Sequence, residues 1–116
     1  GGLYITQQVG EDNDRDLVKM VMPDVEKSYP GYRLDVQREI FEKNGFKIIK
    51  AEESFNPICF YDIGAFVWFA RIIEWEFPGF SVDQYFNKLL EMQSFIEQKG
   101  KIEGTTHRYL IVAQKI

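Results

Sequence analysis

Hydrophobic residues recur along this chain with two different periods, and the periods divide it into short segments. Alternating or β-branched and aromatic runs are typical of strands, whereas repeats of three and four residues are typical of amphipathic helices. The strand pattern covers residues 3–9, 46–51 and 108–113, and the helix pattern covers residues 17–21, 35–44, 62–75 and 82–99. The sequence therefore predicts the order strand, two helices, strand, two helices, strand.

Proline, glycine and capping residues set the predicted boundaries. Pro23 ends the first helix and Gly45 the second, and Pro57 limits the second strand because proline donates no backbone hydrogen bond. Ser81 and Gln84 form a capping-box pattern, so the last helix is expected to begin there. The remaining boundaries are the acidic loop at residues 11–14, which can cap the first helix, and Gly100, which ends the last.

The segment from Asp62 to Trp75 is apolar almost all round, with only Arg71 and Glu74 polar within the body of the helix. Such a helix is expected to be covered on several sides, and Arg71 and Glu74 are expected to pair because they are three residues apart. The aromatic residues here either pack in a core, which is favoured because aromatics dominate buried area, or line a pocket for a flat ligand. They are Phe60, Tyr61, Phe66, Trp68, Phe69 and Trp75.

Composition narrows the class of protein. Of 116 residues, 45% are hydrophobic and 16% aromatic, which is typical of one folded domain. The net charge of −4 disfavours nucleic acid as a partner. A single cysteine, Cys59, allows no internal disulfide and reads as a small hydrophobe, so a reducing, cytoplasmic location is predicted. The sequence has no run of about 20 apolar residues and no signal-peptide pattern, so no membrane association is expected.

Three segments carry a resemblance to a known family. Gly1-Gly2 leads into the strand at Leu3 to Ile5, Asn44-Gly45-Phe46 leads into the strand that runs to Glu52, and His107 to Lys115 form a last strand. In this order they resemble the carboxy-terminal part of class I S-adenosylmethionine-dependent methyltransferases, in which a glycine turn precedes the fifth strand and the seventh strand is antiparallel. The resemblance covers nearly the whole chain.

The resemblance implies an α/β fold, namely the carboxy-terminal half of a Rossmann-like sheet. It implies a mixed three-stranded sheet with the last strand antiparallel and central, and about four helices. Residues 1–116 would be one portion of a methyltransferase domain, with residues 62–100 as a helical insertion that covers the substrate. S-adenosylmethionine would be bound mainly by the missing amino-terminal half, because this chain contains no Gly-x-Gly. The isolated chain is therefore expected to be inactive.

The implied topology gathers polar groups on one rim, where open α/β sheets bind ligands. The predicted substrate-binding residues are Gln7, Gln8, Tyr61, Phe66, Trp68 and Thr106. Gln7 and Gln8 alternate faces, so only one of them can point into a given pocket. His107 is the predicted catalytic base, although a histidine that only donates to a neighbour is the commoner case. Glu52 and Glu53 either position an acceptor or form a solvated edge, and no metal-binding spacing is present.

The predicted partner is a small-molecule methyl acceptor, with the acceptor atom left open. An alternative function is a self-contained module that binds a hydrophobic ligand or assembles with another chain, without catalysis. Under either interpretation the first strand presents an edge with Leu3, Ile5 and Val9, and bare edges pair with other chains. A dimer or a strand-swapped oligomer is therefore expected.

Overall fold

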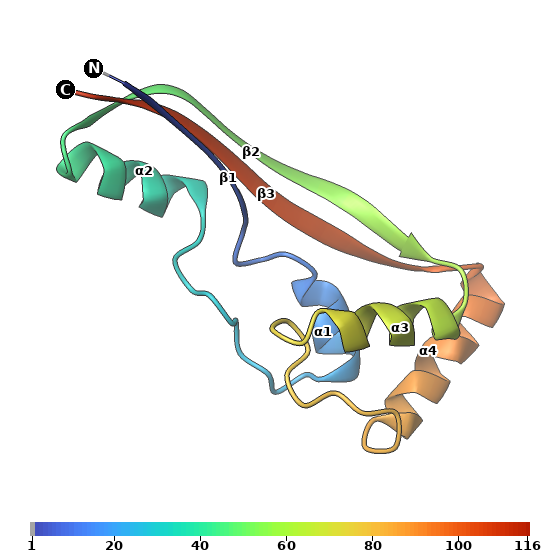
Figure 1. Ribbon diagram of the computed structural model, residues 1–116. Helices are drawn as coiled ribbons and strands as arrows, with labels where there is room; N and C mark the ends of the chain where they lie inside the picture. Colours follow the sequence, from blue (N-terminus) through green and yellow to red (C-terminus); the bar gives the residue numbers. More distant parts are fainter. Residues whose placement is uncertain (1) are drawn as a thin grey trace. The chain divides into compact units, whose positions relative to one another are not determined.

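The computed structural model describes residues 2–116, and Gly1, the first residue of the predicted glycine turn, lies outside them. The described part contains three strands and four helices, in the order predicted from the sequence (Figure 1). They are β1 (Leu3–Val9), α1 (Arg15–Val21), α2 (Leu34–Lys43), β2 (Phe46–Phe60), α3 (Ile63–Ile72), α4 (Phe86–Lys99) and β3 (Ile102–Lys115).

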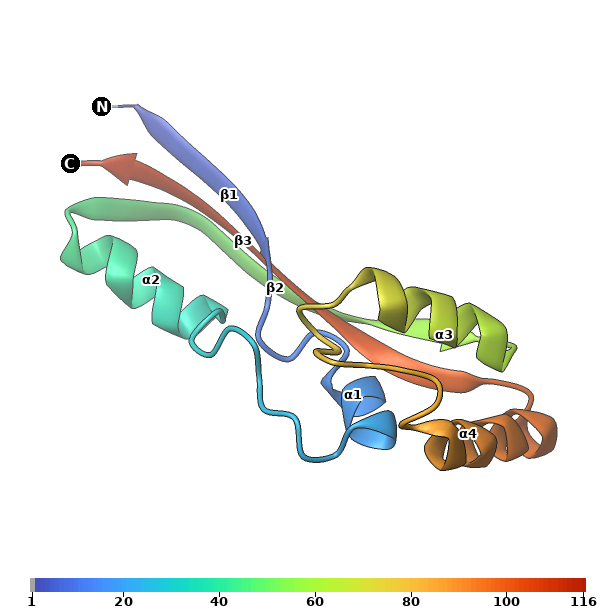
Figure 2. The same ribbon diagram turned by 60° about the horizontal axis from the view of Figure 1, so that its bottom comes forward.

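The three strands form one sheet in the order β1-β3-β2, so the last strand is central, as predicted. β3 pairs with β1 in antiparallel register, with Leu3 opposite Gln114 and Val9 opposite Arg108. β1 and β2 both run opposite to β3 (Figure 2). Because neither pair of neighbours is parallel, the sheet is antiparallel throughout, and the expected mixed pairing is wrong for these three strands.

The chain divides into two compact units. The first unit comprises the described residues up to Asn13, Tyr29–Asn56 and Thr106–Ile116, and so holds β1, α2 and most of β2 and β3. The second comprises Asp14–Ser28 and Pro57–Thr105, and so holds α1, α3, α4 and the remaining ends of the two long strands.

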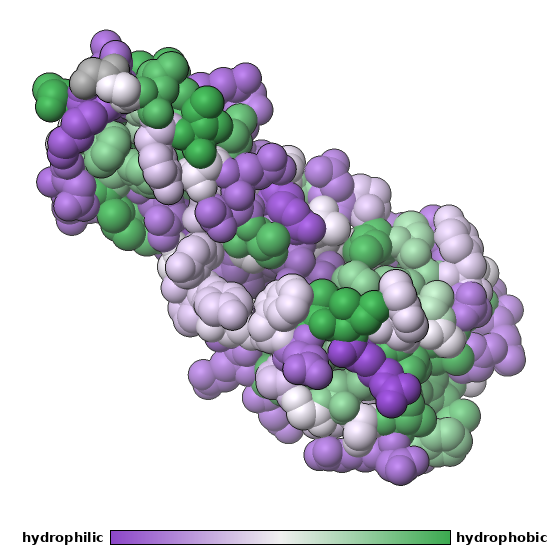
Figure 3. Space-filling model, in the orientation of Figure 1, coloured by the Kyte–Doolittle hydropathy of each residue, from purple (hydrophilic) through white to green (hydrophobic). Residues whose placement is uncertain are grey.

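In the first unit, the apolar side chains of β1 are largely exposed. Leu3 and Ile5 are 63% and 66% exposed, and hydrophobic surface is visible at the end of the sheet that carries the termini (Figure 3). On the other sheet face an aromatic cluster joins α2 to the strands: the ring of Phe41 lies 5.5 Å from Tyr4 and 5.3 Å from Phe46. The face of β3 that carries Tyr109, Ile111 and Ala113 is therefore buried, and the face of β1 that carries Leu3 and Ile5 is open.

The second unit has a conventional core, in which α4 packs against α1 and α3. Phe66 is its aromatic centre, with edge-to-face contacts to Phe60 at 5.6 Å and to Phe77 at 5.7 Å. The other fully or nearly buried core residues are Leu17, Val18, Val21, Met22, Ala70, Leu89, Met92, Ile96 and Ile102.

The second strand is longer than predicted, because β2 continues through Pro57 to Phe60. A proline interrupts pairing only where its nitrogen faces a neighbouring strand. β2 lies at the edge of the sheet, and the carbonyl of Asn56 accepts a hydrogen bond from the Thr106 hydroxyl at 3.0 Å. An edge position therefore tolerates the proline, and β2 runs beyond the strand predicted over residues 46–51.

The last two helices are shorter than predicted. α3 ends at Ile72, buries only Phe66 and Ala70, and leaves Trp68 68% exposed, so the expected cover on several sides is wrong within the described residues. α4 begins at Phe86 and not at the capping box, although the Ser81 hydroxyl accepts from the Gln84 amide at 3.2 Å within a turn. None of the helices in residues 2–116 has the length and apolar character needed to span a membrane.

Candidate functional site

A cavity of about 400 Å³ lies in the first unit, where side chains from all three strands meet. It is lined by Gln7, Glu52, Glu53, Ser54, Arg108, Tyr109 and Leu110. Gln7 and Leu110 face each other across the β1–β3 register, which explains how distant segments reach the same cavity. Because β2 runs on to Phe60, the cavity lies along the middle of this strand and not at its carboxyl end, where the sequence placed Glu52 and Glu53.

His107 is buried, and contacts hold both its ring and its backbone. The side chain is 1% exposed, and its ring stacks on Phe55 with 4.3 Å between ring centres. The backbone is fixed on both sides, because the Gly10 amide donates to the His107 carbonyl at 2.8 Å and the His107 amide donates to Asn13 Oδ1 at 2.9 Å. The loop after β1 therefore positions the imidazole.

Both ring nitrogens of His107 have protein partners. The Asp12 amide donates to Nδ1 at 3.1 Å, so in the neutral ring Nδ1 carries no proton and Nε2 carries it. Nε2 then donates to Glu53 Oε2 at 2.7 Å. With this hydrogen-bond network, His107 has no free nitrogen to take a proton from a ligand, which favours the alternative of a histidine that donates to its neighbour.

Glu53 is the more exposed member of this pair. Its Oε2 atom accepts a second hydrogen bond from the Leu34 amide at 3.1 Å, at the first residue of α2. The N-cap residue Arg33 makes no side-chain cap, so Glu53 stabilises this helix end in its place. The side chain is 28% exposed, and within residues 2–116 its other oxygen, Oε1, accepts no hydrogen bond.

The other charged groups of the cavity are only partly neutralised. Glu52 pairs with Lys50 at 3.5 Å, and both side chains are exposed. Arg108 donates through Nη1 to the His107 carbonyl at 3.0 Å and to the Asn13 side chain. Tyr109 lies opposite Gln8 in the register, so its ring is on the sheet face away from Gln7. Burial raises the pKa of its phenol, with smaller contributions from Tyr32 and Tyr4.

The structure separates the two predicted glutamines. Gln7 lines the cavity, whereas Gln8 lies on the opposite face and donates to the Thr6 hydroxyl at 2.9 Å. Strand alternation predicts this separation. Thr106 is occupied by its hydrogen bond to Asn56 and is not among the residues that line the cavity.

The predicted aromatic contacts lie in the second unit. Phe66 is fully buried in its core, whereas Tyr61 and Trp68 are 67% and 68% exposed. Their substrate-binding role stays a prediction.

Arg108, Tyr109 and Leu110 were missed, although they directly follow His107 on the same strand. The available signal was strand pairing: Leu110 lies opposite Gln7, and alternation places Arg108 and Leu110 on the face of β3 that Gln7 shares.

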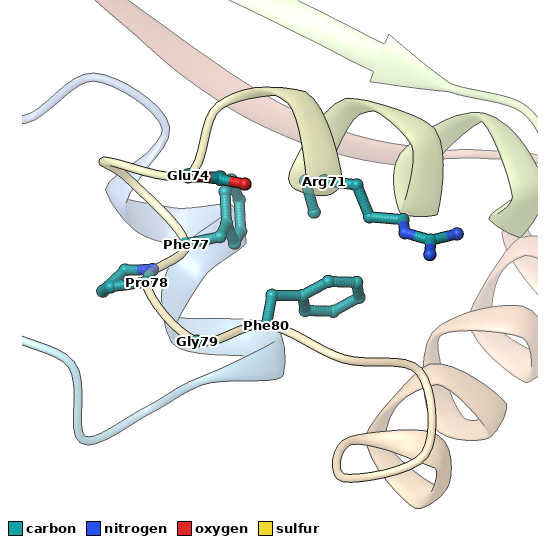
Figure 4. Close-up of a pocket in the computed structure, with 7 residues that line it drawn as sticks. Arg71, Glu74, Phe77, Pro78, Gly79 and Phe80 are labelled. Carbon is teal, nitrogen blue, oxygen red and sulfur yellow. The ribbon is translucent and has the colours of Figure 1, made fainter.

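The second unit has a cavity of its own, of about 490 Å³, at the end of α3 (Figure 4). It is lined by Ala70, Arg71, Glu74, Phe77, Pro78, Gly79 and Phe80. In Figure 4 the Arg71 side chain extends away from Glu74, and no ion pair joins them in the described part of the chain. The expected pair is wrong because α3 ends at Ile72, which places Glu74 in the following loop.

The described residues do not fit a bound S-adenosylmethionine. No glycine lines the cavity of the first unit, so it lacks the glycine-rich turn of the family that the sequence resembles. Residues 2–116 also contain no group of three or more His, Cys, Asp or Glu side chains able to hold a metal ion. Neither a family model nor any curated protein matches the sequence.

Proposed function

We propose that this chain is the carboxy-terminal, substrate-side part of a cytoplasmic S-adenosylmethionine-dependent methyltransferase that acts on a small molecule. The observation that carries the proposal is the strand order β1-β3-β2 with β3 antiparallel to both neighbours. The class I family has this arrangement in its last three strands.

The open surface of β1 supports a larger sheet. Leu3 and Ile5 are mostly exposed, and both belong to a strand that has one neighbour, β3, among the described strands. Apolar residues at a free sheet edge favour pairing with a further strand. In the proposed enzyme that strand belongs to the cofactor-binding half.

The proposed class of methyl acceptor, a small molecule, is argued from the cavity of the first unit. A volume of about 400 Å³ suits a small molecule. This chain's own residues bind and orient the acceptor. When bound by the preceding half of the domain, S-adenosylmethionine would supply an electrophilic methyl group.

The test compares two proteins by calorimetry: the 116-residue chain and a longer product of the same reading frame that includes the sequence upstream of Gly1. We expect micromolar S-adenosylmethionine binding by the longer protein and none by the chain alone. Micromolar binding by the chain alone, or no binding by the longer protein, would contradict the proposal.

The exposed β1 edge also favours a second candidate, a self-contained assembly module that pairs through Leu3 and Ile5. Light scattering separates the two functions. If the edge belongs within a larger enzyme sheet, the chain alone dimerises and the longer protein does not. If assembly is the function, both proteins dimerise.

A further inference from the structure

We propose that the cavity of the second unit binds a small molecule with an ammonium group at one end of an apolar body and a carboxylate at the other. Glu74 binds the ammonium group, Arg71 binds the carboxylate, and the rings of Phe77 and Phe80 contact the apolar body. This cavity shares no lining residue with the cavity of the first unit. The inference therefore goes beyond the proposed function and does not rest on it.

The first step is the turn that forms the apolar wall. Phe77-Pro78-Gly79-Phe80 has the features of a type II turn, with proline in its second position and a glycine of φ 73° in its third. The Phe80 amide closes the turn by donating to the Phe77 carbonyl at 3.2 Å. Figure 4 shows that the two phenyl rings bound the cavity next to the end of α3.

Both rings are fixed by further aromatic contacts. Phe77 is 1% exposed and lies edge-to-face with Phe66 at 5.7 Å, and Phe80 stacks on Tyr85 with 6.0 Å between ring centres. A ligand therefore meets walls that are already ordered, and preorganisation of this kind lowers the entropic cost of binding.

The second step is a pair of opposite charges that the protein leaves without partners. Within residues 2–116 the side chains of Arg71 and Glu74 form no hydrogen bond and no ion pair, and both residues are exposed. In Figure 4 the Arg71 side chain extends away from Glu74, so the two charges lie toward different ends of the cavity. A ligand with a single charge matches only one of them, whereas a zwitterion matches both.

The third step is the position of Glu74 relative to α3. The helix ends at Ile72, and the carboxyl end of a helix carries partial negative charge. Arg71, in the last turn, is favourable there, but the carboxylate of Glu74 just beyond the helix end is not. Helix stability therefore gives a reason for Arg71 and none for Glu74. A bound ammonium group would neutralise the negative charge at this end of the cavity.

A suitable probe is para-(aminomethyl)benzoate, in which a phenyl ring separates the two charges. Its counterparts are para-toluate, without the ammonium group, and para-methylbenzylamine, without the carboxylate. Each is titrated into the ¹⁵N-labelled 116-residue chain, and the backbone amides of Arg71, Glu74 and Phe80 are followed by NMR. We expect saturable shifts with the zwitterion and affinities about tenfold lower for the other two, because each lacks one charge-assisted contact. No saturable shift at these amides, or equal affinity for all three compounds, would overturn the inference.

Two variants assign the ends of the cavity. Arg71→Gln should weaken binding of the zwitterion and para-toluate about tenfold and leave para-methylbenzylamine unchanged. Glu74→Gln should weaken binding of the zwitterion and para-methylbenzylamine and leave para-toluate unchanged. Since both side chains are exposed, we expect both variants to keep the fold, which circular dichroism checks. A variant that weakens all three compounds equally, or none of them, would contradict the assignment.

Arg38→Gln and Glu42→Gln are the matched controls, because they remove the same charges from an exposed ion pair on α2 and neither residue lines the cavity. Neither control should change any of the three affinities. Losses in the controls equal to those in the cavity variants would show an effect of net charge alone and would also overturn the inference. None of these titrations contains S-adenosylmethionine, so their outcome is independent of the proposed function.

Discussion

The His107 ring lies where a side chain on Gly10 would be: a Cβ atom added to Gly10 would be 2.1 Å from Nδ1 and 2.3 Å from the adjoining ring carbons. Gly10 also donates its amide to the His107 carbonyl. The end of β1 is therefore shaped to the imidazole, and the absence of a side chain at Gly10 is what lets the ring reach Glu53.

Gly10→Ala should displace the ring and weaken its hydrogen bond to Glu53. Overpacking at a buried site costs about 1–3 kcal/mol, so we expect a loss of that order in the free energy of unfolding, measured by urea denaturation. Gly2→Ala is the control, because no atom lies within 4 Å of the added Cβ. If both variants were as stable as the wild type, the tight fit of His107 would be wrong.

In the second unit, Gly104 fits tightly against Leu17. A Cβ atom added to Gly104 would lie 2.5 Å from Leu17 Cδ1. Leu17→Ala should cost about 2–5 kcal/mol through the cavity that it leaves. Gly104→Ala should cost about 1–3 kcal/mol through overpacking. The double variant should cost clearly less than the sum, because the new methyl group occupies part of the vacated space. Additive costs in a denaturation cycle would contradict this contact.

The order of elements could be predicted from the sequence because each segment carries its own periodic pattern and stop residue. Gly45 and Gly100, for example, end α2 and α4 with φ angles of 83° and 90°. Boundaries that depend on tertiary position could not be predicted. β2 passes through Pro57 only because it lies at the edge of the sheet, and the register that reveals an edge is not visible in one segment.

Part of the candidate site could also be predicted from the sequence. Gln7, Glu53 and His107 were all placed near one rim from the implied strand order. Their division of roles was not predictable, because it depends on hydrogen bonds between residues far apart in sequence. The Asp12 amide fixes the His107 tautomer and the Leu34 amide holds the Glu53 carboxylate, and neither amide belongs to a recognisable motif.

Asp62 caps α3, with its Oδ1 atom accepting from the Ala65 amide at 2.8 Å. Asp62→Ala should therefore destabilise the protein by about 0.5–2 kcal/mol in thermal unfolding, and Asp62→Asn, which retains an acceptor, should cost much less. Ser81→Ala provides a comparison, because Ser81 bonds within a turn and not at the start of α4. A larger cost for Ser81→Ala than for Asp62→Ala would reverse this assignment of the caps.

Tyr109 makes the stability depend on pH in the alkaline range. Its pKa is raised above the usual 10.0, first by burial and then by Tyr32 and Tyr4. The unfolded chain releases this proton at a lower pH than the folded chain, so the unfolded state binds fewer protons in that window. The stabilisation from Tyr109 is therefore fully present below pH 10.0 and is lost as the pH rises through the folded-state pKa.

The corresponding measurement is urea unfolding of the wild type and Tyr109→Phe at several alkaline pH values, together with tyrosinate absorbance. The wild type should lose stability more steeply than Tyr109→Phe above pH 10.0, and the variant should lack one late-titrating phenol. Parallel stability curves would show that Tyr109 titrates as it does in the unfolded chain.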